Sequence, residues 1–212
     1  IIKGEEFTNI LSRNLKMDIG ASSFILSDDS ENMDYLTLNT RNTDSAWFPE
    51  LKKTLNNDSL DLIINAKRNK FASVERNKAL DFDVILGNTD IPTNVDISLG
   101  AGDGTIALLS TKIERLFASV GAGQLNIIID ENATAEVIDL NVGTGDITLK
   151  FPAETEYMIE YSVGLGKISF NNKDIADGFA SDNTLSSAGY NTSGGILIKI
   201  DLGLGDVDIE QE

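Results

Sequence analysis

Apolar residues recur at a fixed spacing in the second half of the chain, around pairs of glycines separated by one residue. This Gly-x-Gly motif occurs five times, with its first glycines at positions 100, 121, 143, 164 and 203, so that the spacings are 21, 22, 21 and 39 residues. A constant period of this length indicates supersecondary units that stack on one another. Around each pair, Val, Ile, Leu and Phe alternate with polar residues, which is typical of strands with one buried and one solvated face.

This pattern predicts an all-β fold, a β-solenoid-like stack of about five to six two-strand coils with Gly-x-Gly corners. Glycine suits the corners because it reaches positive φ without steric cost. The alternation predicts that the following residues are buried: Ile127, Ile147, Leu149, Ile168 and Val207. The residues between them are predicted to point outward: Asn126, Thr148, Ser169 and Asp208.

The first 90 residues carry a weaker form of the same organisation. The stretch from Leu15 to Leu26 fits the repeat as a degenerate first coil, with Ser22 in place of the second glycine, within two strands expected over residues 7–27. Three more apolar runs predict further strands: residues 35–40, 60–65 and 80–86. We therefore expect an N-terminal β region over 1–90 and a Gly-x-Gly repeat region over 91–212, forming one continuous domain.

Residues 171–195 interrupt the period. They are rich in Asn, Ser, Asp and Gly, and this composition predicts a long loop inserted into the last coil. No segment has a convincing helical pattern, and residues 51–55 and 173–179 are expected to hold at most a turn.

The composition excludes several classes of function. The 212 residues include 34 acidic and 17 basic side chains, a net charge of −17, which argues against binding to nucleic acid or to an anionic membrane surface. Cysteine and histidine are both absent, which removes disulfides, thiolate metal sites and the commonest general base. The sequence contains no run of 18 or more apolar residues, the length that a membrane-spanning helix needs.

The residues that follow the glycine pairs are the main candidates for chemistry. In chain order they are Asp103, Gln124, Asp146, Lys167 and Asp206. If the coils stack in chain order, Lys167 lies between Asp146 and Asp206 and no two carboxylates are adjacent. The nearest aspartates would then be about 9–10 Å apart, at the upper limit for a glycosidase acid pair. A cation site among the three aspartates and a carbohydrate-cleaving groove remain alternatives, but the sequence identifies no catalytic, cofactor-binding or metal-binding residue.

Three further features have a structural and a functional interpretation. Gly100 to Gly104 resembles part of a dinucleotide-binding loop, but such a loop needs a following helix, whereas residues 105–109 continue as a strand. The basic cluster from Lys67 to Lys78 is either a solvated hairpin tip or a site for phosphates or an acidic partner. Three aromatic residues could form a platform for sugars, or the tryptophan could fill the core: Trp47, Phe179 and Tyr190.

The chain resembles a known bacterial family in three stretches. These are Leu15-Lys-Met-Asp-Ile-Gly20, Trp47-x-Pro-Glu50, and the final repeat from Ile200 to Ile209 with its Gly-Leu-Gly-Asp unit. Together with the serial glycine pairs they are similar to the toast-rack family, to the C-terminal domain of LiaF-like cell-wall-active-antibiotic response proteins, and to related predicted adhesin domains. The resemblance implies an all-β domain, usually associated with the envelope through a signal peptide, a lipid anchor or separate membrane segments. It supplies no catalytic residues, and Gln124 and Lys167 depart from the aspartate that follows the other glycine pairs.

The sequence thus predicts a non-catalytic, envelope-associated structural, adhesive or signal-modulating domain. The alternative is a carbohydrate-binding or carbohydrate-cleaving β-helix, and a third possibility is a cation-dependent surface protein. An envelope protein, a glycan or a second copy of the chain is the expected partner, with no nucleic acid, no cofactor and at most weak binding of divalent cations. We expect an extracytoplasmic or cell-surface location, with anchoring through a removed N-terminal segment; the cytoplasmic side of the membrane is the alternative.

Overall fold

The computed structural model describes residues 1–3, 9–41, 49–66, 80–191 and 194–212, and the fold is given for these residues. Their regular structure consists of twelve strands in one sheet. Within the described ranges there is no helix, and therefore none long and apolar enough to cross a membrane. The predicted all-β class is confirmed.

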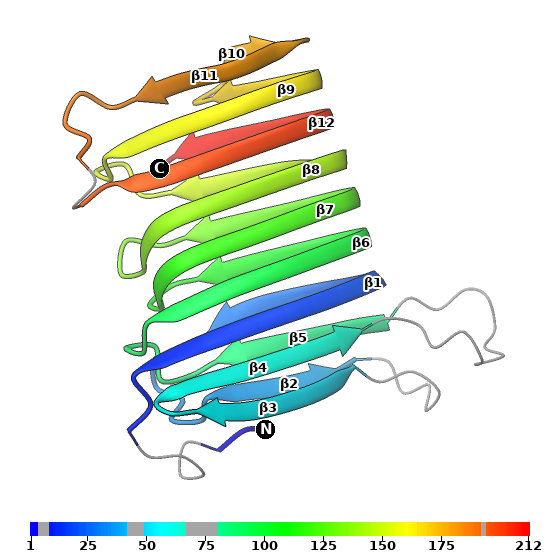
Figure 1. Ribbon diagram of the computed structural model, residues 1–212, viewed down its shortest axis with the longest axis vertical. Helices are drawn as coiled ribbons and strands as arrows, with labels where there is room; N and C mark the ends of the chain where they lie inside the picture. Colours follow the sequence, from blue (N-terminus) through cyan, green and yellow to red (C-terminus); the bar gives the residue numbers. More distant parts are fainter. Residues whose placement is uncertain (4–8, 42–48, 67–79, 192–193) are drawn as a thin grey trace, which may run out of the picture.

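Six long strands, of 14 to 18 residues each, carry the glycine corners. They are β1 (Ser12–Asp28), β6 (Thr93–Leu108), β7 (Lys112–Ile129), β8 (Thr134–Phe151), β9 (Tyr157–Phe170) and β12 (Ile196–Gln211). In Figure 1 each of them crosses the front of the molecule, turns, and returns behind. We call the layer formed by the halves before the corner the front face, and the layer formed by the halves after it the back face.

The corners are tight because neighbouring strands approach at their glycines. Gly123 has a φ of 124°, and a Cβ added to it would lie 1.9 Å from the carbonyl oxygen of Gly102 in the next strand. Gly205 has a φ of 134°, and its Cβ would lie 2.1 Å from the carbonyl oxygen of Gly145. Both the backbone conformation and the close contact exclude a side chain, so the period of the sequence follows from the stacking of these corners.

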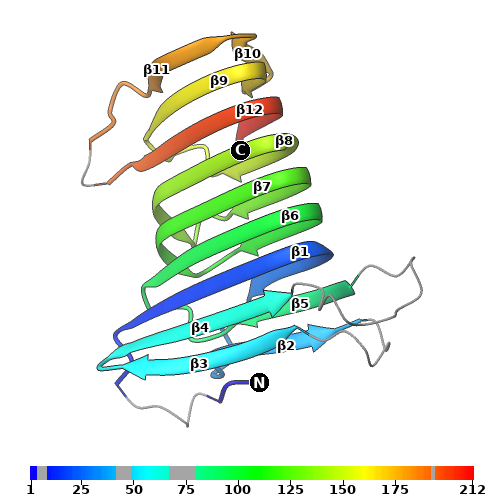
Figure 2. The ribbon, with the colours of Figure 1, turned by 45° about the vertical axis from the view of Figure 1, so that its right-hand side comes forward.

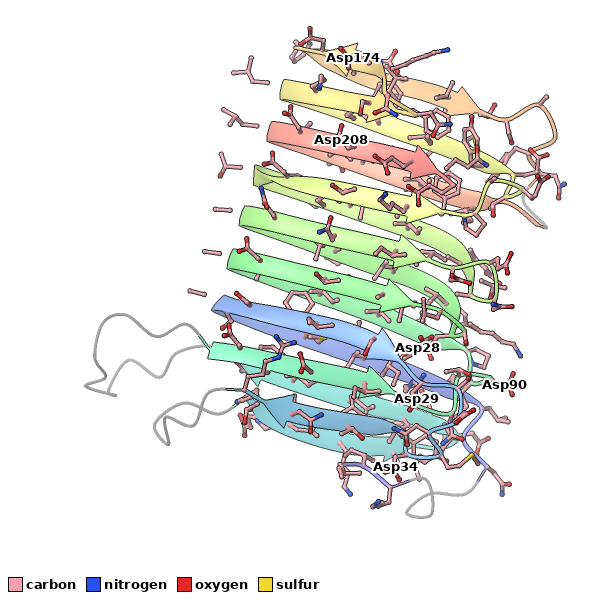
Figure 3. The ribbon with its side chains drawn as sticks, turned by 180° about the vertical axis from the view of Figure 1, so that it is seen from behind. Asp28, Asp29, Asp34, Asp90, Asp174 and Asp208 are labelled. Atoms are coloured by element: carbon pink, nitrogen blue, oxygen red, sulfur yellow. The ribbon has the colours of Figure 1, made fainter. Side chains whose placement is uncertain are left out.

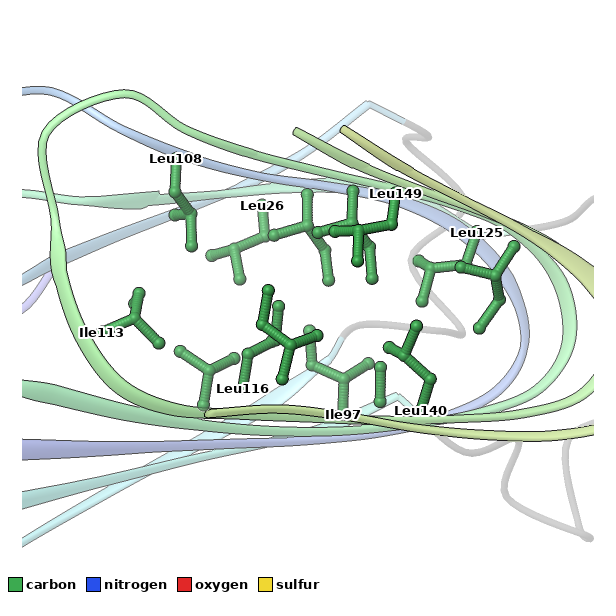
Figure 4. Packing of buried hydrophobic residues seen from close by; sticks show 14 of the residues in the cluster. Leu26, Ile97, Leu108, Ile113, Leu116, Leu125, Leu140 and Leu149 are labelled. Atoms are coloured by element: carbon green, nitrogen blue, oxygen red, sulfur yellow. The ribbon is translucent and has the colours of Figure 1, made fainter. Parts of the chain in front are cut away.

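Between the two layers lies one continuous apolar core, shown in Figure 4. The five residues predicted to be inside are buried: Ile127, Ile147, Leu149, Ile168 and Val207. Asn126 and Asp208 are exposed and Thr148 is partly exposed, as predicted. Ser169 was also predicted to point to solvent, but it is only 6% exposed. Its neighbours on both sides, Asp208 and Asp174, cover it, and its hydroxyl donates a hydrogen bond to Asp208.

The strands do not stack in chain order, which corrects the sequence-based expectation. From one end of the sheet to the other, the order of the long strands is β9, β12, β8, β7, β6 and β1, all parallel. The last strand therefore lies between β8 and β9 (Figure 1). Likewise, the first strand lies between β6 and a split coil formed by β4 (Ser59–Ala66) and β5 (Leu80–Leu86), which pair with its two halves.

Both ends of the stack are closed by short strands that run in the opposite direction. At one end, β3 (Glu50–Asn56) pairs with β4, and β2 (Leu36–Thr40) pairs with β5. At the other end, β10 (Lys173–Asp177) and β11 (Ala180–Ser186) pair with the two halves of β9. The prediction of one long loop over 171–195 is therefore wrong, as is that of a mere turn over 51–55 and 173–179.

The hairpin between β9 and β10 explains this difference. Phe170 pairs with Lys173, and the two residues between them, Asn171 and Asn172, have φ values of 49° and 61°. Two successive positive φ angles are the signature of a type I′ turn, which Asn adopts more easily than most residues. The polar composition of the segment thus encodes a tight hairpin and an exposed terminal coil.

Candidate functional site

A groove of about 560 Å³ crosses β4, β1, β6 and β7 on the front face. We call it the front groove. The side chains at its surface come from outward positions of these four strands: Asn14, Lys16, Asp61, Ile63, Asn94, Asp96, Arg115 and Phe117. It therefore combines amides, carboxylates, two cations and one aromatic ring on a rigid sheet, a combination typical of a binding site for a polar ligand.

Hydrogen bonds between the strands hold the amides of the groove in place. The Asn14 amide donates to Asp61 at 2.7 Å, and the Asn94 amide donates to the side-chain amide oxygen of Asn14 at 3.3 Å and to Glu114 at 2.9 Å. Asn14 also donates to the Ser59 hydroxyl at 3.1 Å. Because the side chains are already ordered, a ligand would lose little by immobilising them.

A β-bulge shapes one wall of the groove. Thr93 of β6 pairs with Ile113 and Asn94 pairs with Arg115, so that Glu114 is an extra residue on β7. Bulges bend a strand and redirect the side chains next to them. Here Arg115 binds Asp139 at 2.6 Å, and its guanidinium carbon lies 5.8 Å from the centre of the Phe117 ring. The wall therefore presents an aromatic ring beside a planar cation whose charge is paired.

Inside the stack, a buried arginine fixes the start of β1. Arg13 is fully buried and donates to the Thr93 hydroxyl at 3.1 Å and to the carbonyl oxygens of Tyr35 at 2.9 Å and Gly87 at 2.7 Å. Burial lowers the pKa of Arg13 from its ordinary value to about 10, and the negative charge of Asp28 opposes this shift. These bonds join the end coil to β6 directly beside Asn14 of the groove.

Ion pairs across neighbouring strands occur on the front face both in the groove and beyond it. Lys16 lies 3.3 Å from Asp96, and the nitrogen of Lys199 lies 3.5 Å from Glu160 at the other end of the stack. A second depression of about 360 Å³ surrounds the latter pair, on β9, β11 and β12. Ion pairs thus occur toward both ends of this face, although the whole chain has a net charge of −17.

The residues after the glycine corners lie in one series on the back face, in a different order from the predicted one. Gln124 separates Asp103 from Asp146, as expected. However, Asp206 pairs with Lys167 on one side, and its backbone N–H donates to the Asp146 carboxylate at 3.1 Å on the other. Lys167 therefore does not separate the two aspartates. The insertion of β12 between β8 and β9 is the reason, and it makes two carboxylates adjacent.

The back face is consequently acidic toward one end. Asp208 lies in the same strand as Asp206, and Asp174 lies beyond Ser169 in β10 (Figure 3). Among the described residues, no group of three or more Asp and Glu side chains is arranged to hold a metal ion. Asp146 and Asp206 are exposed. Both carboxylates therefore face solvent rather than an apolar enclosure.

The remaining sequence-based candidates do not form a site in the described part of the chain. Trp47 and the cluster from Lys67 to Lys78 lie outside the described residues. Phe179 is 83% exposed at the corner end of β11, whereas Tyr190 lies beyond the opposite end of that strand, roughly 20 Å away by strand length. These two do not share a platform. The glycines from 100 to 104 lie inside β6, which continues as a strand to Leu108, as expected.

The front groove cannot be recognised from any single stretch of the chain, although the sequence contains a signal for it. Aligning the repeats on their first glycine brings together the residues four positions before it: Lys16, Asp96, Phe117, Asp139, Glu160 and Lys199. In the structure these residues are neighbours across the strands of the front face. The signal lies in comparison between repeats, because each residue by itself is an ordinary surface position.

Two solved structures resemble this fold. The crystal structure of a "putative cell adhesion protein" from Clostridium sporogenes ATCC 15579 matches with a TM-score of 0.75 and 21% identity, over 100% of this chain and 97% of that one. A "putative adhesin" from Bacteroides fragilis NCTC 9343 matches with a TM-score of 0.37 and 13% identity, over 95% of this chain and 94% of that one. The first likeness shows a shared fold along the full length.

The comparison with family models identifies the family. None of the curated proteins compared with the sequence matches it. The family model Toast_rack_N, described as the N-terminal domain of toast_rack, DUF2154, matches residues 5–150. This match covers more than half of the chain, and it includes the degenerate first repeat and three of the five glycine pairs. The chain therefore belongs to the toast-rack family.

Proposed function

We propose that this protein is a non-catalytic structural and adhesive domain of the cell envelope, and that it binds an extended, uncharged glycan in the front groove. The chemistry of the groove carries the proposal. Amide groups and carboxylates of Asn14, Asn94 and Asp61 can exchange hydrogen bonds with sugar hydroxyl and acetamido groups. Phe117 offers a flat apolar surface to the C–H face of a sugar ring.

The charges of the front face favour a neutral ligand. Lys16 and Arg115 are paired with Asp96 and Asp139, so neither cation of the groove is left to attract an anionic group. Neighbouring strands repeat at about 4.8 Å, so an extended chain running along the stack would meet a new set of side chains at each strand. The net charge of −17 acts against polyanionic ligands.

An extracytoplasmic or cell-surface location is part of this proposal. The adhesion-related description of the Clostridium sporogenes structure supports it, as does membership of the toast-rack family. In such a location the rigid, doubly capped stack would serve as a spacer that presents its front face to wall glycans or to neighbouring cells.

Isothermal titration with the hexasaccharide of N-acetylglucosamine, and in parallel with cellohexaose, tests the proposal. We expect saturable binding that falls at least tenfold in Asn94→Ala and in Phe117→Ala, because each removes one groove contact worth about 1.4 kcal/mol. The matched control is Asn126→Ala, an exposed amide on the back face that should leave the affinity unchanged. Absence of binding to both sugars, or an equal loss in the control, would refute the assignment of the groove.

Carbohydrate cleavage is the second candidate, because Asp146 and Asp206 are adjacent. Two carboxylates about 5 Å apart are the arrangement of retaining glycosidases. However, both are exposed on the opposite face from the groove. The proposed function predicts no release of reducing ends from either oligosaccharide; release that disappears in Asp206→Asn would favour the enzyme instead.

A further inference from the structure

The two ends of the stack have the same construction. At each end the last strand on the front face runs against the direction of the coils: β3 beside β4 at one end, and β11 beside β9 at the other. Figure 2 shows these two strands at opposite ends of the molecule. Within the described residues, β3 pairs with the strand β4 only and β11 with the strand β9 only, so each is the last strand of the front face at its end of the sheet.

The two edges also lie in register on the front face. The residues of successive strands that pair with one another form a continuous series from Thr54 of β3 to Ser186 of β11, passing through Asn14 and Asn94 of the groove. A second series runs in the same way from Lys52 to Thr184. Because β4 and β9 are parallel, β3 and β11 run in the same direction. A second molecule placed on top of the first would therefore continue the sheet with its β3 beside β11.

Charge distinguishes this head-to-tail contact from contacts between like ends. By sequence, β3 carries two lysines and one glutamate, a net charge of +1 (2 − 1). The described side chains of the cap formed by β10 and β11 include one lysine and two aspartates, a net charge of −1 (1 − 2). Opposite charges favour pairing of unlike ends, whereas two like ends repel each other.

The apolar side chains on the inward side of β3 are incompletely buried, so a second molecule that covers them would bury further apolar surface. Leu55 is 43% exposed and Leu51 is only partly buried, although both pair with core positions of β4. At the other end, Leu185 of β11 is partly buried against the core. On the back face the corresponding edge is less open, because Ile2 already bridges to Leu36 of β2. The front-face strands are therefore the available edges.

We infer that copies of this chain associate head to tail, with the β11 edge of one copy adding to the β3 edge of the next as a parallel strand, so that the front grooves of successive copies form one longer track. The contact is heterologous and does not close on itself, so it produces linear assemblies rather than a symmetric dimer. This inference concerns assembly and does not depend on the identity of the glycan.

Disulfide trapping tests the contact, since the chain contains no cysteine. Thr54 and Ser186 are both exposed, and neighbouring strands bring Cα atoms within the distance that a disulfide spans. After mild oxidation with diamide, the double variant Thr54→Cys/Ser186→Cys should give a ladder of dimers, trimers and higher species on a non-reducing gel. A mixture of the two single variants should stop at the dimer, and each single variant by itself should remain monomeric.

Each other outcome contradicts the inference. A dimer from Thr54→Cys alone or from Ser186→Cys alone would show pairing of like ends, and monomers throughout would show that the edges do not meet. Circular dichroism of the reduced variants identifies any that fail to fold. Sedimentation velocity of the unmodified protein provides an independent measurement. The weight-average sedimentation coefficient should rise with concentration at low salt and rise less in Lys52→Glu, whereas a concentration-independent value in both would overturn the inference.

Discussion

The glycine corners give the most decisive test of how the stack is held together, and Gly123→Ala is the perturbation to make. Gly123 has a φ of 124°, and an alanine Cβ there would lie 1.9 Å from the carbonyl oxygen of Gly102. A non-glycine residue in such a conformation costs about 1–3 kcal/mol. The contact also forces β6 and β7 apart at the corner, which removes one or two hydrogen bonds of about 1 kcal/mol each.

These two terms predict a loss of about 2–5 kcal/mol in the free energy of unfolding. For a chain of this length, each kcal/mol corresponds to about 2–4 °C in melting temperature, so a decrease of about 4–20 °C is expected. Urea unfolding followed by far-ultraviolet circular dichroism measures the free energy, and differential scanning calorimetry measures the melting temperature.

Substitutions at two other glycines allow the cost of the backbone conformation to be measured separately from the cost of the close contact. Gly178 has a φ of 79° but open space around its would-be Cβ, so Gly178→Ala should lose only about 1–2 kcal/mol through the backbone. Gly194 has neither constraint, so Gly194→Ala should be neutral or more stable by up to about 1 kcal/mol, since alanine reduces the entropy of the unfolded chain. If Gly123→Ala lost no more stability than Gly178→Ala, the argument from close packing of the corners would be refuted.

The remaining predictions concern the core, the buried arginine and the back face. Ile147→Asp should cost about 4 kcal/mol or more by urea unfolding, because it buries a carboxylate without a partner, and a loss below 1 kcal/mol would contradict the buried position. Arg13→Met should cost about 2–4 kcal/mol, because it leaves the buried acceptors of three hydrogen bonds unsatisfied. Since the pKa of Arg13 is about 10 in the folded protein and higher in the unfolded chain, the unfolded chain binds more protons above pH 10, so the stability advantage over Arg13→Met should widen as the pH rises from 9 to 11. Asp146→Asn keeps an acceptor for the Asp206 N–H and removes a like charge, so it should raise the melting temperature slightly at low salt and not at high salt; a decrease at low salt would refute the repulsion.

The burial pattern could be predicted from the sequence, because alternation along a strand decides which side chains face the core. Ile127, Leu149 and Val207 follow this rule without exception. The positions of the corners could also be predicted from the sequence. They need glycine because the backbones of neighbouring strands approach too closely for a side chain at Gly102 and Gly123.

The neighbours of each strand could not be predicted in the same way. Alternation is equally satisfied whether β12 lies beyond β9 or between β8 and β9, since each strand offers two similar edges. The position of β12 follows from the antiparallel cap, in which β10 and β11 occupy the far edge of β9. Asn171 and Asn172 carried the hairpin signal, but the polarity of the whole segment resembled a loop.

To predict the front groove, both the outward side chains of each strand and the order and register of the strands must be known. Its chemistry is distributed over strands that are up to 103 residues apart in sequence, from Asn14 to Phe117 (117 − 14). The bulge at Glu114, which directs Arg115 and Phe117 toward the groove, depends on how β7 pairs with β6. A single sequence contains the residues, but only the register between strands brings them together.

Backbone amide mapping by nuclear magnetic resonance tests the central functional proposal most directly. Titration of the labelled protein with the N-acetylglucosamine hexasaccharide should shift amide signals of Asn14, Asp61, Asn94 and Phe117 in a saturable manner, and should leave those of Asn126 and Asp146 on the back face unchanged. Shifts confined to the back face, or none at saturating sugar, would contradict the assignment of the front groove as a glycan-binding site.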